Sequence, residues 1–130
     1  YGVMHRNTYI NAPQILEITT QLKTKPTLLV AGQISGVEGY VESAASGLIS
    51  GINAARLFRQ QEPLVPPRYS AIGSLLYYIT HASTEGFQPM NITFGLIPPW
   101  PEKINDKKAK NHLIAQRALE EIRKWKYMVT

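Results

Sequence analysis

The feature that most constrains the fold is the segment LLVAGQISGVEGYVESAASGL, residues 28–48. An apolar run leads into a turn rich in Gly and Ser, and Ala, Ser and Gly then recur along a longer segment. A β-branched and Leu-rich run such as residues 27–31 is typical of a strand buried in a parallel sheet. A glycine loop over residues 32–36 and a helix over residues 37–58 would complete a βα unit.

The start of this helix is the first candidate binding site. The spacing Ser35-x-x-Glu38 matches a capping box, which predicts that the helix begins just after the glycine loop. A helix start presents unpaired N–H groups and a partial positive charge, which suits a phosphate or another electron-rich edge of a ligand. Gly36 and Gly39 leave room for that ligand. The G-x-G-x-x-G fingerprint is missing, so an ordinary βα unit without a ligand is an open alternative.

Small residues also recur every four positions along this helix, at 39, 43, 47 and 51. Such a strip allows another backbone to pack closely. Tyr40 is expected in the core.

Short strands are predicted at residues 6–10 and 14–18. Ser70 is placed to cap a helix that ends near His81. One face of this helix is expected to be buried and consists of Ile72, Leu75, Leu76 and Ile79. A proline-interrupted segment, residues 87–101, should lie extended across a surface.

A last helix is predicted over residues 106–126, with one apolar stripe. The stripe consists of Ile114, Ala118, Ile122 and Trp125. Residues 1–100 contain six Lys or Arg against five Asp or Glu, whereas residues 101–130 contain eight against four. A basic helix of this kind favours a polyanion such as RNA, and a solvated helix face is the alternative.

Composition excludes several classes of site. With 130 residues, 44% of them hydrophobic, the chain has the length and core of one domain. It contains no cysteine, which excludes a disulfide, a thiolate zinc site and a cysteine nucleophile within these residues. The three histidines lack metal-ligand spacing, so no metal is expected. No apolar run approaches the ~20 residues that span a bilayer and no signal peptide is evident, so we expect no membrane contact and a cytoplasmic location.

Four blocks together resemble one known family. GQISGVEGYVESAASGLISGINAAR is similar to the C-terminal FAD-contacting motif of the folate- and FAD-dependent tRNA uracil-5-methyltransferases. YGVMHRNTYINAP, LLYYIT and FQPMNITFGLIPP resemble three further blocks of that family in the expected order. The flavoprotein that modifies the wobble uridine of tRNA shares the GQI-type loop but differs after it.

The resemblance implies an α/β fold, the C-terminal part of a Rossmann-like FAD-binding domain followed by a mainly helical segment. Residues 1–62 would belong to the FAD domain, and residues 63–130 would form a Pro-rich connector and a basic helical segment. The chain also opens without Met in an extended pattern, so we expect a fragment of a longer protein. The remainder of the FAD domain is then a partner, and an interface left exposed could drive oligomer formation.

The implied activity transfers a one-carbon unit from 5,10-methylenetetrahydrofolate to C5 of the T-loop uridine of tRNA. FAD, reduced by NAD(P)H, would carry that unit. Family members use cysteine in catalysis, so the catalytic residues are expected outside this chain, and the fragment alone is expected to be inactive. The alternatives are a fragment of the wobble-uridine flavoprotein and a non-catalytic basic binding module.

Residue roles follow from the same resemblance. The FAD contacts would come from Gln33, Ile34, Ser35, Gly36, Val37 and Glu38. The amide of Gln33 can donate and accept toward a flavin edge, whereas Glu38 has its capping box as an alternative role. His5 and Arg6 are the folate candidates, with an RNA phosphate as a second ligand for Arg6. The tRNA candidates are Lys107, Lys110, Arg123, Lys124 and Lys126.

Overall fold

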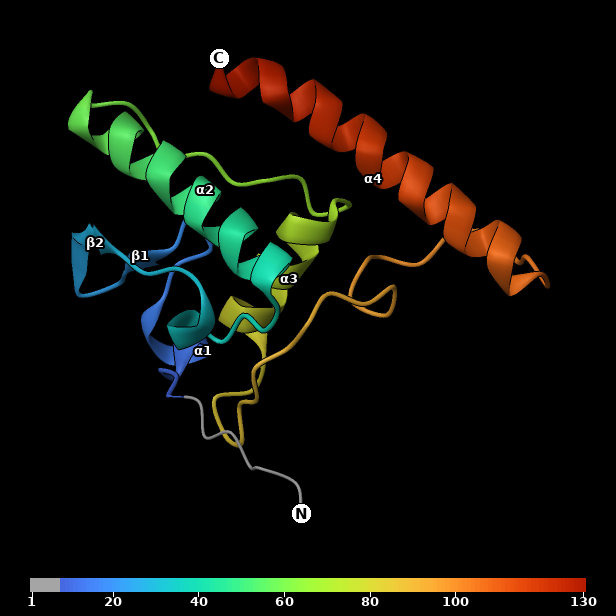
Figure 1. The fold of residues 1–130 in the computed structure, drawn as a ribbon, viewed down its shortest axis with the longest axis horizontal. Coiled ribbons are helices and arrows are strands. Elements are labelled where there is room, and N and C mark those ends of the chain that lie inside the picture. The colour runs from blue at the N-terminus through green and yellow to red at the C-terminus, as the bar shows by residue number, and fades with distance from the viewer. Residues whose placement is uncertain (1–7) are drawn as a thin grey trace.

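The structure is a computed structural model that describes residues 8–130. The elements are α1 (Ala12–Ile15), β1 (Gln21–Leu22), β2 (Lys25–Leu29), a 3-10 turn (Gln33–Ser35), α2 (Tyr40–Phe58), α3 (Ala71–His81) and α4 (Lys107–Val129). Figure 1 shows α1, the two strands, α2 and α3 grouped together, with α4 along one side. His5 and Arg6 lie outside the described residues, as do the first two residues of the predicted strand at 6–10.

The predicted strand at residues 14–18 is wrong. Pro13 lies in the first turn of α1, where its missing N–H is tolerated. Residues 8–10 are not in a strand either, and Leu16 makes only an isolated bridge with Leu22. The chain therefore enters the core as one helical turn.

The strand of the expected βα unit exists, but its partner differs from the prediction. β2 pairs with β1 in an antiparallel arrangement, with Gln21 opposite Leu29 and Leu22 opposite Lys25. Leu28 is 49% exposed, so within the described residues β2 is not a buried parallel strand. A short apolar run does not specify the direction of pairing, and the tight turn between β1 and β2 brings the preceding strand alongside.

The predicted helix is confirmed as α3, and three residues of its predicted buried face are buried, whereas Ile72 is half-buried beside a cleft between α3 and α4. Ser70 caps α3, because its side chain accepts a hydrogen bond of 3.0 Å from the amide of Gly73. Leu75, Leu76 and Ile79 are at most 1% exposed. They pack in one cluster with Ala12, Leu16, Val37, Ile49 and Phe87. The same core thus joins α1, α2 and α3.

Apart from Ile49, the buried residues of α2 are polar and form hydrogen bonds to neighbouring loops. Ser46 accepts from the amide of Gly32 at 2.8 Å, and Ser50 shares a 2.7 Å hydrogen bond with Thr20. Asn53 donates to Leu64 and accepts from the amide of the same residue. Buried polar groups are retained when they are paired in this way. Polar residues on this buried face therefore hold the loops against α2.

The opposite face of α2 carries the glycines. A Cβ built at Gly47 or Gly51 would meet no atom within 4 Å. Among residues 8–130 nothing packs against Gly47 and Gly51, whereas Gly39 lies beside Asn91 and Ser43 beside Gly32. Tyr40, which was expected in the core, is 98% exposed, because α2 begins with this residue at the surface.

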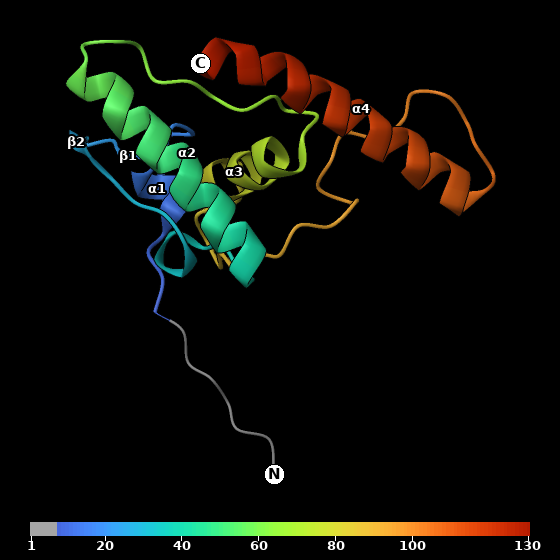
Figure 2. The ribbon, with the colours of Figure 1, turned by 45° about the horizontal axis from the view of Figure 1, so that its top comes forward.

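The last helix is confirmed as α4, with Asp106 as its N-cap. Ile114 is the one residue of α4 that is buried, and the rest of the predicted stripe is half-buried. In Figures 1 and 2 the first half of α4 projects beyond α2 and α3. An apolar cleft of about 440 Å³ separates α4 from the other two helices. No helix in the described part of the chain is both long and apolar enough to cross a membrane.

Arg117 connects α4 to the proline-rich segment. Its guanidinium carbon lies 4.3 Å from the ring centroid of Tyr69 and 5.4 Å from that of Trp100. It also donates hydrogen bonds to the carbonyls of Pro98 and Pro99. One cation near two aromatic rings therefore attaches the middle of α4 to the proline-rich segment.

Candidate functional site

The loop between β2 and α2 does not form the predicted capping box. The helix begins at Tyr40, after Gly39 with a φ of 100°, and has no side-chain cap. Ser35 donates its hydroxyl to the carbonyl of Gly32 at 2.6 Å. Residues 36–38 instead pair with Met90, because the amide of Glu38 donates to its carbonyl at 3.0 Å. This long-range pairing holds the chain out of a helical conformation before Tyr40.

The pairing also decides which groups of residues 33–38 a ligand can reach. The amides of Gly36 and Glu38 already donate to Gln33 and Met90, so they are not the free helix-start donors that were predicted. Ser35 and Val37 are buried, at 1% and 0% exposure. Ile34 has an exposed side chain, and its carbonyl accepts from Ile10. The side chains of Gln33 and Glu38 remain accessible at the surface.

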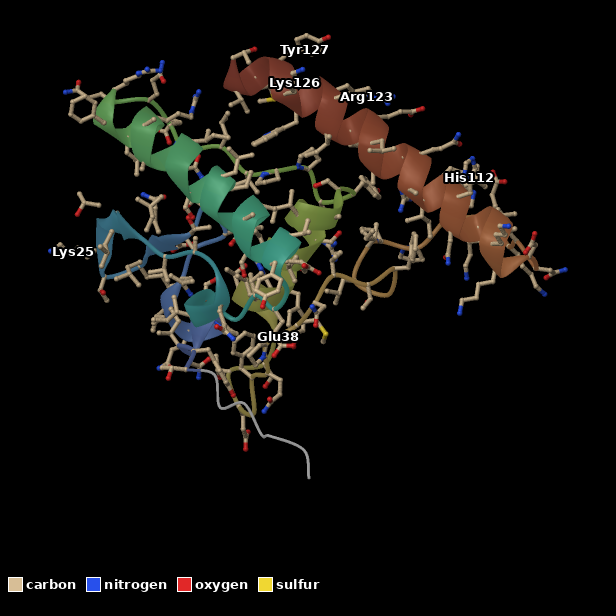
Figure 3. All side chains as sticks on the ribbon, in the orientation of Figure 1. Lys25, Glu38, His112, Arg123, Lys126 and Tyr127 are labelled. Carbon is tan, nitrogen blue, oxygen red and sulfur yellow. The ribbon has the colours of Figure 1, made fainter. Side chains whose placement is uncertain are left out.

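Gln33 and Glu38 meet at a polar cavity of about 310 Å³ beside the start of α2. Its lining residues are Gln33, Glu38, Gly39, Tyr40, Ser43 and Asn91. Figure 3 shows Glu38 below the first turn of α2, on the side away from α4. The cavity thus brings the GQI loop together with the residue that follows Met90.

Asn91 is the member of this cavity that sequence reasoning missed. A Cβ on Gly39 would lie 3.0 Å from Nδ2 of Asn91, so the two residues are direct neighbours. Asn91 reaches the site because its neighbour Met90 pairs with residues 36–38. No local sequence pattern predicts the contact between Asn91 and Gly39. The resemblance of FQPMNITFGLIPP to a family block was the one signal that pointed to this segment.

The chemistry of the cavity suits a ligand edge that both donates and accepts hydrogen bonds, because the carboxylates of Glu38 and Glu42 lie beside the helix start. The first amides of α2 lack a side-chain cap, and the positive end of the helix dipole lies there. Gln33 and Asn91 add amides that both donate and accept, and Ser43 adds a hydroxyl. A volume near the lower end for ligand cavities fits one part of a large cofactor rather than the whole molecule.

The predicted tRNA residues form two groups on α4. Lys107 and Lys110 lie in its first turn, and Arg123, Lys124 and Lys126 lie near its end. The rise of an α-helix places these groups roughly 20–28 Å apart. Lys124 makes an ion pair of 3.6 Å with Glu121. In Figure 3, Arg123 and Lys126 lie toward the C-terminal end of α4, well beyond His112.

The imidazole of His81 lies at the end of α3, where its Nδ1 is 3.0 Å from the carbonyl of Tyr77. This is the position expected for a helix-end imidazole. Among residues 8–130 no three His, Cys, Asp or Glu side chains are grouped to hold a metal ion.

The family model described as "Glucose inhibited division protein A" matches residues 1–62. The protein from Listeria welshimeri named methylenetetrahydrofolate--tRNA-(uracil-5-)-methyltransferase TrmFO is 60% identical over 95% of this chain. A protein of the same name from Pelotomaculum thermopropionicum is 59% identical over 97% of the chain. The chain belongs to the TrmFO/GidA family.

A solved structure supports the same relationship at the level of the fold. Aquifex aeolicus GidA in its form II crystal matches 52% of this chain, with 36% sequence identity and a TM-score of 0.50. The match covers 11% of the GidA chain. This chain likewise spans 29% of the length of each of the two TrmFO relatives described above, which are therefore much longer proteins. The α/β fold class expected of a TrmFO/GidA protein is confirmed.

Proposed function

We propose that this chain is part of a longer folate- and FAD-dependent tRNA uracil-5-methyltransferase. The observation that carries the proposal is the identity of 54–60% to proteins of that name from several bacteria, over nearly the whole chain. The complete enzyme would transfer a one-carbon unit from 5,10-methylenetetrahydrofolate to C5 of the T-loop uridine of tRNA, with NAD(P)H as reductant.

The cavity beside α2 is the part of this chain that we assign to FAD. Gln33 and Asn91 would hydrogen-bond the cofactor, and the uncapped start of α2 would face an edge of it that both donates and accepts hydrogen bonds. When bound, the flavin would supply the redox step of one-carbon transfer. This chain would contribute orientation and exclusion of water at that end of the cofactor. Ser35 and Val37 would support the loop from within, because both are buried.

The cations of α4 and the N-terminal residues complete the proposal. Lys107, Lys110, Arg123, Lys124 and Lys126 would contact tRNA, and His5 and Arg6 would contact folate. The proposed boundary between the FAD domain and the helical segment lies after residue 62, where the match to the family model ends. Because α3 packs in the same core as α1 and α2, this boundary would divide functions rather than two hydrophobic cores.

The assay of the full-length enzyme tests the proposal directly. Purified enzyme should carry flavin absorbance and transfer label from methylenetetrahydrofolate to an unmodified tRNA transcript. A transcript whose T-loop uridine is replaced should accept no label. Enzyme that takes up no FAD, or that leaves the T-loop uridine unchanged, would refute the proposal.

The substitution Gln33→Ala tests the cavity itself. We expect about tenfold weaker FAD retention, because the variant removes one amide that hydrogen-bonds the cofactor. The matched control is Gln116→Ala, an exposed glutamine of α4 that should leave retention unchanged. Equal FAD occupancy in both variants would remove Gln33 from the site.

A second candidate is the flavoprotein that modifies the wobble uridine of tRNA. It is favoured by the GidA description of the family model and by the GidA structure. The same labelled assay distinguishes the two, because the wobble enzyme would modify a tRNA whose T-loop uridine has been replaced.

A further inference from the structure

A second cavity, of about 400 Å³, lies where the proline-rich segment meets the start of α4. Its floor includes Ile97 and Ile114, which are 7% and 3% exposed. Trp100 and Phe94 add aromatic surface, and the Phe94 ring is 46% exposed. An apolar and aromatic floor of this size suits a planar ring.

The rim of the cavity comes from the first two turns of α4. Lys107, Lys110 and Asn111 line it there. Aromatic surface, two ammonium groups and one amide that donates and accepts therefore meet in one place. Residues of two segments, 94–100 and 107–114, are needed to form it.

The excess of positive charge at this end of α4 is partly offset by the N-cap carboxylate of Asp106, which accepts a hydrogen bond from the amide of Lys108. The first turn of α4 contains Lys107, Lys108 and Lys110 and no acidic residue. The positive end of a helix dipole repels ammonium groups. Within residues 8–130 the one ion pair joins Lys124 and Glu121, so no described carboxylate pairs with Lys107 or Lys110. A bound anion would relieve the rest of this repulsion.

The aromatic side of the cavity is held in place before any ligand arrives. Arg117 lies 5.4 Å from the ring centroid of Trp100 and donates to the carbonyls of the two preceding prolines. A stacking surface that is already ordered loses less conformational entropy on binding. The ring of Trp100 is therefore an ordered surface on which a ligand ring can stack.

We propose that this cavity binds one unpaired nucleotide of an RNA substrate. The base would stack on the aromatic surface of Phe94 and Trp100, and Lys107 and Lys110 would neutralise the adjacent phosphate. Proteins read single-stranded RNA by stacking bases that are turned out of a helix. This inference rests on the proposed function, since it gives the tRNA substrate a specific contact on this chain.

Binding of an unmodified tRNA transcript to the full-length enzyme, measured at several salt concentrations, tests the site. We expect Lys107→Ala with Lys110→Ala to weaken binding about tenfold and to reduce the salt slope by about 1–2. Phe94→Ala should weaken binding about tenfold with an unchanged slope, because stacking carries no charge. The matched controls are Lys108→Ala in the same helical turn and Phe58→Ala, which is 90% exposed on α2.

Both controls should bind tRNA within twofold of the wild type, and all variants should retain flavin. If Lys108→Ala weakens tRNA binding as much as the double variant does, the affinity comes from the general positive charge of the helix and not from the cavity. That result would overturn the proposal. Unchanged tRNA affinity in Phe94→Ala, or a raised KM for folate or NAD(P)H alone, overturns it as well. If the double variant does not fold, Lys107→Gln should still lower the slope by about 1.

The same experiment separates this site from the proposed function. A wild-type enzyme that methylates tRNA, with cavity variants that bind normally, would overturn only the nucleotide site. A wild-type enzyme that neither binds nor methylates tRNA would overturn both.

Discussion

Residues 8–97 and the helix α4 are stabilised in different ways. In the first region Leu16, Leu75, Leu76 and Ile79 are at most 1% exposed and share one core. In α4 only Ile114 is buried, and an apolar cleft separates the helix from α2 and α3. The first region can therefore hold a binding loop rigidly, whereas α4 is attached by the contacts of Arg117 and by the half-buried Trp125, which packs against the core.

Charge divides along nearly the same boundary. Residues 1–100 carry six basic against five acidic side chains, and residues 101–130 carry eight against four. The near-neutral part contains the polar cavity that we assign to the cofactor and the two aromatic rings of the proposed nucleotide site, and the basic part contains the cations that we assign to RNA. One short chain thus combines a well-packed region that carries the proposed cofactor cavity with a basic helix, α4.

The largest effect is expected in the core. Leu76→Ala should lower the free energy of unfolding of the chain by about 2–5 kcal/mol, because it leaves a cavity among fully buried side chains. Leu119→Ala in α4 removes a side chain that is 53% exposed, and it should cost less than about 1 kcal/mol. Urea denaturation of both variants measures the difference. Similar losses in the two would contradict the contrast between the regions.

Two glycines in the first region should respond in opposite directions. A Cβ at Gly73 would lie 1.9 Å from the carbonyl oxygen of Pro67, so Gly73→Ala should destabilise the chain by about 1–3 kcal/mol or more. A Cβ at Gly47 meets open space in α2, so Gly47→Ala should stabilise it by roughly 0.5–1 kcal/mol. Thermal melting of the 130-residue chain would distinguish them. A stabilised Gly73→Ala variant would mean that the start of α3 packs differently.

A smaller and more local effect is expected at the junction with α4. Arg117→Met keeps the aliphatic stem but removes the cation over Tyr69 and Trp100, which should cost about 1–2 kcal/mol. Amide hydrogen exchange should quicken in α4 while α3 stays protected. Arg123→Met, an exposed control near the other end of α4, should change exchange little. Equal exchange in both variants would show that Arg117 does not hold the helix.

Local signals predicted α3 and α4 well. The Ser70 cap and the spacing of Leu75, Leu76 and Ile79 gave α3, and the period of the apolar stripe gave α4. These features depend on residues a few positions apart, which a single sequence displays. The fold class and the family likewise came from continuous blocks of sequence.

Features that depend on distant residues were not predictable in this way. Ser35 and Glu38 have the spacing of a capping box, but Gly36 has a left-handed conformation and the hydrogen bonds of Gly36 and Glu38 with Met90 delay the helix until Tyr40. The same pairing brings Asn91 into the candidate cavity, where no local pattern places it. The antiparallel partner of β2 was missed because its apolar run is compatible with either direction. His5 and Arg6, which lie outside the described residues, stay predictions.

The position of the flavin in the full-length enzyme tests the central claim most directly. A crystal structure of that enzyme with FAD bound should place part of the cofactor in the cavity lined by Gln33, Tyr40 and Asn91, against the start of α2. A cofactor bound with no atom in contact with that cavity would contradict the account.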